Sequence, residues 1–286
     1  MSRTPSRRFG RRVAGAIVAV GAVLAVAACS SGSSASSTTG PSVAGSAADS
    51  GSASGSAAPE ATGTLTVFAA ASLKSTFTAI GQTFQEQHPG VTVTFNFAGS
   101  SDLVTQLTSG APADVFAAAD GKNMTKAVDG GVVDGTPVNF ASNTLTIVTA
   151  PGNPKGLTGF ADLAAPGLQV VVCAPQVPCG SAAQKVEQST GVTVTPVSEE
   201  SSVTDVLNKV VTGQADAGLV YVTDATGAGD KVTQVPFPEA ASAVNVYPIA
   251  PLTSAAQPEL AAAFIELVTG PDGQRILSDA GFRPAP

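Results

Sequence analysis

Hydroxyl groups and free backbone amides recur at the most suggestive places in this sequence. Ser72 and the pair Ser100–Ser101 each lie where a strand-like run gives way to a helical period, and Ser202 lies just before another helical period. The first amides of a helix have no intrahelical partner, and the helix dipole places partial positive charge there. Several such helix starts at one cleft could bind an oxyanion through neutral groups alone. Ordinary N-capping is the alternative interpretation of each serine taken singly.

Groups for catalysis are scarce. Nucleophilic catalysis needs a base beside the nucleophile, and the only imidazole is that of His88, in a segment typical of a helix end. A histidine there has a plain structural role in the field of the helix dipole. The sequence holds neither a phosphate-binding loop nor a dinucleotide fingerprint, despite its 30 glycines. We therefore expect a protein that is not an enzyme and uses no cofactor.

The charge balance excludes partners that are captured by broad positive charge. Removal of residues 1–28 takes away five arginines and no acidic residue, so nine basic and 21 acidic residues remain, a net charge of −12. A nucleic-acid partner is therefore not expected. An anionic ligand would have to be bound by a local site.

Two of the three cysteines lie close together in the chain. Cys173 and Cys179 are six positions apart in a segment that contains two prolines. Exported chains favour disulfides, so we expect these two residues to form one. A metal-binding pair is the weaker alternative, because no nearby histidine or third cysteine would complete a coordination shell.

The N-terminal segment is typical of an export signal. Residues 1–12 carry five arginines, and residues 13–28 form an uncharged apolar run that is short for a membrane anchor. The segment Leu24–Cys29 resembles the lipobox of bacterial lipoproteins, in which Cys29 would be lipidated and hold the exported protein on the outer face of the cytoplasmic membrane. Export by the Sec or the twin-arginine route stays open. Residues 29–61, rich in Ser, Gly and Ala, read as a flexible tether.

From about residue 62 the chain alternates strand-like runs with helical periods. Strands are expected at residues 64–70, 91–97, 113–116, 144–148, 169–172 and 217–222. Helices are expected after each of the first three strands and at residues 203–211, 260–268 and 274–277. Ser72, Asp120 and Ser202 are the expected N-caps. This alternation predicts an α/β fold with parallel sheets.

Short motifs spread over residues 62–286 resemble those of the periplasmic molybdate-binding proteins of ATP-driven importers. That family belongs to the type II periplasmic binding proteins, and this chain looks like a lipoprotein form of it. The motifs, in chain order, are Thr66–Leu73, Phe97–Ser101, Gly110–Asp120, Val177–Gly180, Gly218–Tyr221, Gly270–Gln274 and Gly281–Phe282.

The resemblance implies a set of ligand-binding residues. In that family two serines with their amides, two further backbone amides and a tyrosine hydroxyl hold a tetrahedral oxyanion. The matching positions here are Ser72, Ser100, Cys179, Val203 and Tyr221. Ser101 stays open as the second serine. Molybdenum would be bound only as the molybdate oxyanion, by these same residues.

The resemblance also implies a fold and a function. The fold has two lobes, each a mainly parallel sheet flanked by helices, with the ligand in the cleft between them. Lobe I would comprise residues 62–142 and 245–286, lobe II residues 143–244, and the cleft would close by a hinge near residues 141–145 and 243–248. The implied function is that of a monomeric receptor that delivers molybdate or tungstate to an ABC transporter permease. A receptor for sulfate or another oxyanion on the same fold stays open.

Overall fold

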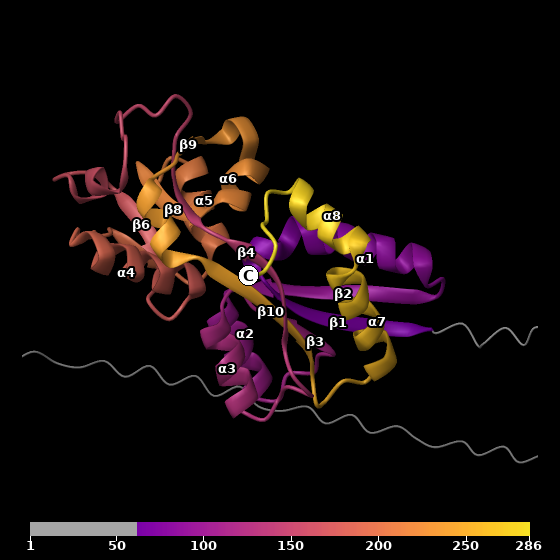
Figure 1. Cartoon of the computed structure of the whole chain (residues 1–286). Coiled ribbons are helices and arrows are strands. Elements are labelled where there is room, and N and C mark those ends of the chain that lie inside the picture. Colours follow the sequence, from indigo (N-terminus) through magenta and orange to yellow (C-terminus); the bar gives the residue numbers. More distant parts are fainter. Residues whose placement is uncertain (1–61) are drawn as a thin grey trace, which may run out of the picture. The chain divides into compact units, whose positions relative to one another are not determined.

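Residues 62–286 are the part of the chain that the structure, a computed structural model, describes (Figure 1). They form two five-stranded sheets flanked by helices, so the predicted α/β class is confirmed. The predicted signal peptide at residues 1–28, the lipidation at Cys29 and the tether at residues 29–61 lie outside the described residues.

The first sheet has the strand order β2-β1-β3-β10-β4. Its strands are β1 (Gly63–Ala70), β2 (Val91–Ala98), β3 (Val115–Ala117), β4 (Val138–Asn143) and β10 (Asn245–Pro251). Strand β1 pairs in parallel with β2 and β3, whereas β10 is antiparallel to both β3 and β4. Four strands therefore run in one direction, and β10 is inserted against them.

The second sheet repeats this plan with the strand order β7-β6-β8-β5-β9. Its strands are β5 (Leu145–Thr149), β6 (Val170–Cys173), β7 (Ser198–Glu200), β8 (Ala217–Tyr221) and β9 (Thr233–Val235). Strand β6 pairs in parallel with β7 and β8, and β5 is antiparallel to β8 and β9. Each sheet is thus mainly parallel with one reversed strand, which the alternation of strands and helices does not predict.

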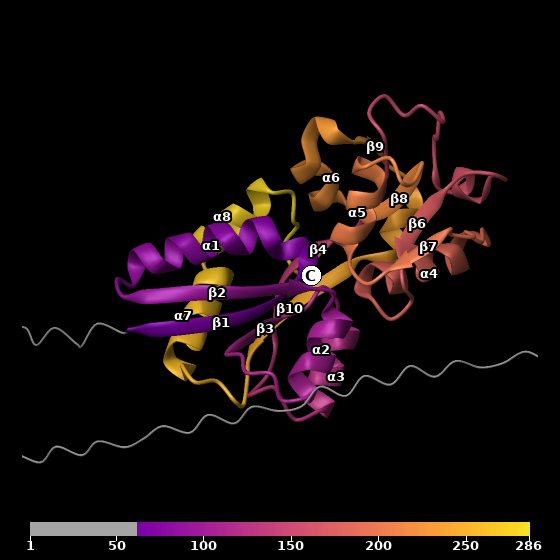
Figure 2. The ribbon, with the colours of Figure 1, turned by 180° about the vertical axis from the view of Figure 1, so that it is seen from behind.

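Helices cover both faces of the first sheet, because its strands are apolar on both sides. Leu65 and Val67 of β1 share a core with α1 (Lys74–Gln87), α7 (Pro258–Thr269) and α8 (Pro271–Asp279). Phe68 points the other way, into a core with α2 (Ser100–Thr108) and α3 (Gly121–Asp129). Figures 1 and 2 show these two groups of helices from opposite sides of the molecule.

The second sheet is flanked by α4 (Pro178–Thr190), α5 (Val203–Val211) and α6 (Val222–Ala228). Helix α5 begins where the sequence predicts, since Ser202 is its N-cap and accepts a hydrogen bond from the Asp205 amide at 3.3 Å. Its buried valines lie so close to β8 that a Cβ on Gly218 would be 2.8 Å from the Val206 side chain. Short 3₁₀ turns complete the fold: η1 (Ala71–Leu73), η2 (Phe160–Ala164), η3 (Gly229–Lys231) and η4 (Pro238–Ala243).

The chain passes between the two sheets twice, and both passages are short. It leaves the first sheet at the end of β4 and enters the second at Leu145, then returns from η4 to β10 through Val244. Asn143 and Asn245 are paired across the β4–β10 ladder at this point, and both are buried.

Among residues 62–286 none of the helices has the length and apolar content that a membrane crossing requires.

Candidate functional site

One small pocket is lined by residues from the parts of the chain that build both sheets. It encloses about 190 Å³ of space, part of which is open to solvent. All five residues that the sequence singles out for an oxyanion line this pocket. The lining consists of Ala70, Ala71, Ser72, Gly99, Ser100, Ala119, Val177, Pro178, Cys179, Val203 and Tyr221.

The five candidate residues reach the pocket because each lies at the end of a strand or shortly after it. Ser72 lies in η1 after β1, and Ser100 is the first residue of α2 after β2. Cys179 is the second residue of α4 after β6, Val203 is the first residue of α5 after β7, and Tyr221 ends β8. The carboxyl ends of the strands in an α/β sheet are where ligands bind in such folds.

Three helices bring free amides to the pocket. The N-caps of α2 and α4 are Gly99 and Val177, and neither makes a side-chain capping bond. Because the first amides of a helix have no intrahelical acceptor, those of Ser100 and Cys179 remain available to a ligand. Helix α5 is capped by Ser202 through the Asp205 amide, which leaves the amide of Val203 available as well.

The Ser100 side chain is placed as a hydrogen-bond donor. Its exposed fraction is 1%, and its Oγ accepts a hydrogen bond from the Ala119 amide at 3.0 Å. A backbone amide can only donate, so the hydroxyl hydrogen of Ser100 must find another acceptor. Ser101 does not line the pocket, and its buried Oγ has no hydrogen-bond partner within residues 62–286. The geometry therefore places Ser100 and not Ser101 at the pocket.

Ser72 does not cap the helix that follows it, so the predicted N-cap is wrong. Leu73 occupies the N-cap position of α1, because a 3₁₀ turn that contains Ser72 precedes the helix. The Ser72 hydroxyl instead forms a buried hydrogen bond of 3.0 Å with the Tyr247 hydroxyl. Sequence reasoning missed Tyr247, although the chain contains only two tyrosines and this scarcity marks both.

Tyr221 carries a buried hydroxyl that the described residues leave without a partner. Its exposed fraction is 1%, and its hydroxyl oxygen has no hydrogen-bond partner among residues 62–286. Burial, together with Tyr247 and the carboxyls of Asp120 and Asp224, raises the pKa of Tyr221 well above its ordinary value. The hydroxyl therefore keeps its hydrogen, and an unpaired buried hydroxyl costs about 1–3 kcal/mol unless a ligand accepts from it.

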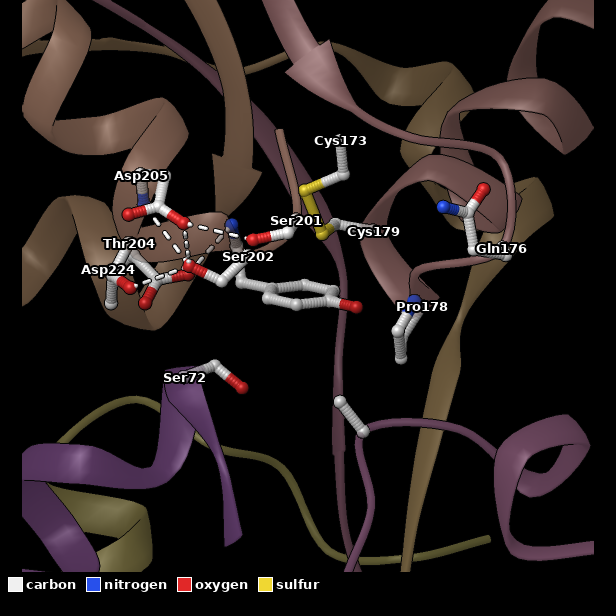
Figure 3. The surroundings of a disulfide bond; sticks show 12 residues. Ser72, Cys173, Gln176, Pro178, Cys179, Ser201, Ser202, Thr204, Asp205 and Asp224 are labelled. Carbon is white, nitrogen blue, oxygen red and sulfur yellow. Dashed lines mark hydrogen bonds between the residues drawn. A yellow bond between two sulfur atoms is a disulfide. The ribbon is translucent and has the colours of Figure 1, made fainter. Parts of the chain in front are cut away.

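A disulfide bond fixes the start of α4. Cys173 and Cys179 are joined, with their Cα atoms 5.6 Å apart, as the sequence predicts (Figure 3). Gly180 lies against the ring that the bond closes, since a Cβ there would overlap the carbonyl oxygens of Cys173 and Ala174. The Cys179 amide is thus presented by a constrained segment.

The pocket is neutral and rich in donors. None of its lining residues within the described part of the chain is charged. His88 lies elsewhere, at the C-cap of α1, and packs at a tilt against Phe84 with 4.3 Å between the ring centroids. Backbone amides and three hydroxyls with no basic side chain suit a small, fully deprotonated oxyanion. Each of these groups can donate a hydrogen bond, and the lining contains no carboxylate that could accept one from a protonated anion.

The chain resembles known solute-binding proteins in sequence and in fold. The family model for "Bacterial extracellular solute-binding protein" matches residues 65–283. The chain is 60% identical over 218 residues to "Molybdate-binding protein ModA" of Mycobacterium tuberculosis (strain H37Rv), covering 76% of this chain and 84% of the relative. It is 31% identical over 230 residues to the protein of that name in Escherichia coli K12, covering 77% and 89%. The solved periplasmic molybdate-binding protein of Azotobacter vinelandii shares the fold, with a TM-score of 0.65 at 24% identity, covering 76% of this chain and 98% of that one.

Asp224 predicts a pH dependence of stability. Burial raises the pKa of its carboxyl to about 7, opposed by a hydrogen bond from the Tyr221 amide at 3.1 Å. A carboxyl with a raised pKa in the folded state stabilises the fold below its unfolded pKa, and this contribution is lost as the pH rises through 7. Asp224→Asn should therefore unfold at higher urea concentration than the parent at pH 8 and at nearly the same concentration at pH 4.

The control for this comparison is Asp230→Asn, at an exposed position just beyond α6. Its difference from the parent should be the same at both pH values. A gap between Asp224→Asn and the parent that stays constant from pH 4 to pH 8 would contradict the assignment of a raised pKa.

Proposed function

Because the chain belongs to the family of bacterial extracellular solute-binding proteins, we propose that it captures molybdate and delivers it to the permease of an ABC transporter. The identity of 60% to a molybdate-binding protein supports the choice of ligand. The observation that carries the proposal is the buried Tyr221 hydroxyl, which has no partner within residues 62–286 and lines a neutral pocket of helix N-termini.

The donors of the pocket can supply the binding free energy without a basic residue. Ser72, Ser100, Cys179, Val203 and Tyr221 offer about five to seven charge-assisted hydrogen bonds, each contributing roughly 1.5–3 kcal/mol. A micromolar complex needs about 8 kcal/mol, so bonds near the upper end of this range also cover the cost of immobilising the ligand. The disulfide adds to this by holding the Cys179 amide in place before the ligand arrives.

The finer assignments are part of the same proposal. The protein binds and releases its ligand and is not an enzyme, it takes tungstate as well as molybdate, and it acts as a monomer. Lipidation at Cys29 holds it on the outer face of the membrane, and residues 29–61 let the binding part reach the permease. The negative charge of the mature chain supports a lipid anchor, since the protein surface would be repelled by an anionic membrane.

The pocket offers hydrogen-bond donors and no carboxylate acceptor, and this predicts which anions it binds. Molybdate and tungstate are dianions without hydrogen near neutral pH, so all of their oxygens can accept. Phosphate keeps at least one hydroxyl, which would face only donors and cost about 1–3 kcal/mol. In titration calorimetry we expect molybdate and tungstate to bind alike, sulfate to bind weakly because its shorter bonds leave donors out of reach, and phosphate to bind at least roughly tenfold more weakly than molybdate. Phosphate binding as tight as molybdate binding, or a preference for sulfate, would refute this assignment.

The two serines predict a loss of affinity without a loss of fold. Ser72→Ala and Ser100→Ala each remove one donor to a charged ligand, which should weaken molybdate binding by about tenfold to a hundredfold. The matched control is Ser101→Ala, because Ser101 neighbours Ser100 but does not line the pocket. Calorimetry gives the affinity, and thermal unfolding of the ligand-free variants checks that they fold. Full affinity in the variant that lacks both serines would show that the pocket is not the molybdate site.

The backbone at Gly99 lies in close contact with that of Ser201, and we expect molybdate binding to depend on this contact. Gly99 precedes α2 beside the first sheet, and a Cβ there would overlap the carbonyl oxygen of Ser201, which follows β7 of the second sheet. Gly99→Ala should therefore hold these two segments apart and weaken molybdate binding by at least about tenfold, since donors from both would no longer reach one ion. In small-angle scattering we expect molybdate to compact the parent, because donors from both sheets must reach one ion, and to compact Gly99→Ala less.

The control for this variant is Gly121→Ala at the first residue of α3. A Cβ on Gly121 meets nothing within 4 Å, so affinity and compaction should be those of the parent. If Gly99→Ala binds molybdate as the parent does and compacts equally, the contact plays no part in capture.

A further inference from the structure

Tyr247 forms the only side-chain hydrogen bond that the structure gives to Ser72 within residues 62–286. It lies on β10 with an exposed fraction of 0%, and its hydroxyl is 3.0 Å from the Ser72 Oγ. Its ring is held edge-on against Tyr221, Phe140 and Phe282, with centroid separations of 6.0, 6.3 and 5.3 Å. The pocket does not include Tyr247 in its lining, so the side chain lies behind the first serine and not at the ligand.

The hydrogen bond between the two hydroxyls can run in either direction. Each group carries one hydrogen, and burial raises the pKa of Tyr247 above its ordinary value, so the phenol keeps its hydrogen. If Ser72 donates to Tyr247, an oxygen lone pair of Ser72 faces the pocket and repels an anion. If Tyr247 donates to Ser72, the hydrogen of Ser72 is free to point at the anion.

The hydrogen of Ser100, the second serine of the pocket, is directed by a partner behind it. Its Oγ accepts from the Ala119 amide at 3.0 Å, and the Ala119 carbonyl in turn accepts from the Asn245 side-chain amide at 2.8 Å. Asn245 and Tyr247 both belong to β10, the strand by which the chain returns to the first sheet. One strand therefore lies behind both serines and supplies a partner to each, directly for Ser72 and through Ala119 for Ser100.

We propose that Tyr247 is a positioning residue of the anion site, whose hydroxyl donates to Ser72 and so commits the Ser72 hydrogen to the bound oxyanion. This inference rests on the proposed function, since it is a bound oxyanion that requires Ser72 to donate. The chain of donors from Tyr247 through Ser72 to the ligand strengthens both bonds, because hydrogen bonds in series polarise one another in a buried site.

Tyr247→Phe tests the proposal with little change in packing. The phenyl ring keeps the aromatic contacts and loses only the hydroxyl. We expect molybdate to bind roughly fivefold to tenfold more weakly, the loss that removal of one hydrogen bond of ordinary strength produces. The melting temperature of the ligand-free variant should stay close to that of the ligand-free parent, because the packing of the ring is kept.

A double-mutant cycle separates positioning from a merely structural role. In a Ser72→Ala background the Tyr247 hydroxyl has nothing to position, so adding Tyr247→Phe should leave the affinity unchanged within about twofold. In a Ser100→Ala background the loss should persist, because Ser72 is still present. Tyr221→Phe is the matched variant: that hydroxyl lines the pocket itself, so its loss should appear in both backgrounds.

The outcomes distinguish this inference from the function on which it rests. If the parent protein does not bind molybdate, the proposed function fails. If the parent binds molybdate and Tyr247→Phe binds it equally well, or if Tyr247→Phe costs as much in the Ser72→Ala background as in the parent, the positioning role of Tyr247 is overturned while the proposed function stands.

Discussion

Binding an anion away from water without a counter-charge is the constraint on which the rest of this structure depends. Neutral donors can meet this constraint only if they point at the ion and have no competing acceptor within the protein. The amides at the starts of α2, α4 and α5 satisfy this because the helices themselves leave them free. The hydroxyls satisfy it differently: Ser100 accepts from the Ala119 amide, and Tyr221 has no competing partner within the described residues.

The sheets exist, in this view, to bring those donors to one point. Parallel strands deliver each helix start to the same edge, and the reversed strands β5 and β10 carry the chain between the two sheets close to the pocket. The disulfide and Gly180 fix the start of α4, and β10 lies behind both serines. Rigid supports of this kind lower the cost of ordering the site when the ligand binds.

The sequence predicts those parts of the fold that local signals determine. The valines of α5 recur with a helical period behind Ser202, and that helix begins as expected. Strand β10 escapes prediction because it contains Pro248 and is buried by partners far away in the chain. No helix is expected over α4 from the sequence, although Pro178 at its first position is a known helix-start signal. The role expected of Ser72 as a cap was wrong because its partner, Tyr247, is 175 residues away, a contact that no local pattern encodes.

Crystals of the protein grown with molybdate would test the central claim most directly, through the anomalous scattering of molybdenum. We expect one strong peak in the pocket, with no lysine or arginine in contact. The oxygens around it should lie within hydrogen-bond distance of the hydroxyls of Ser72, Ser100 and Tyr221 and the amides of Cys179 and Val203. A peak beside basic side chains, or an ion in this pocket that reaches the protein only through water, would contradict it.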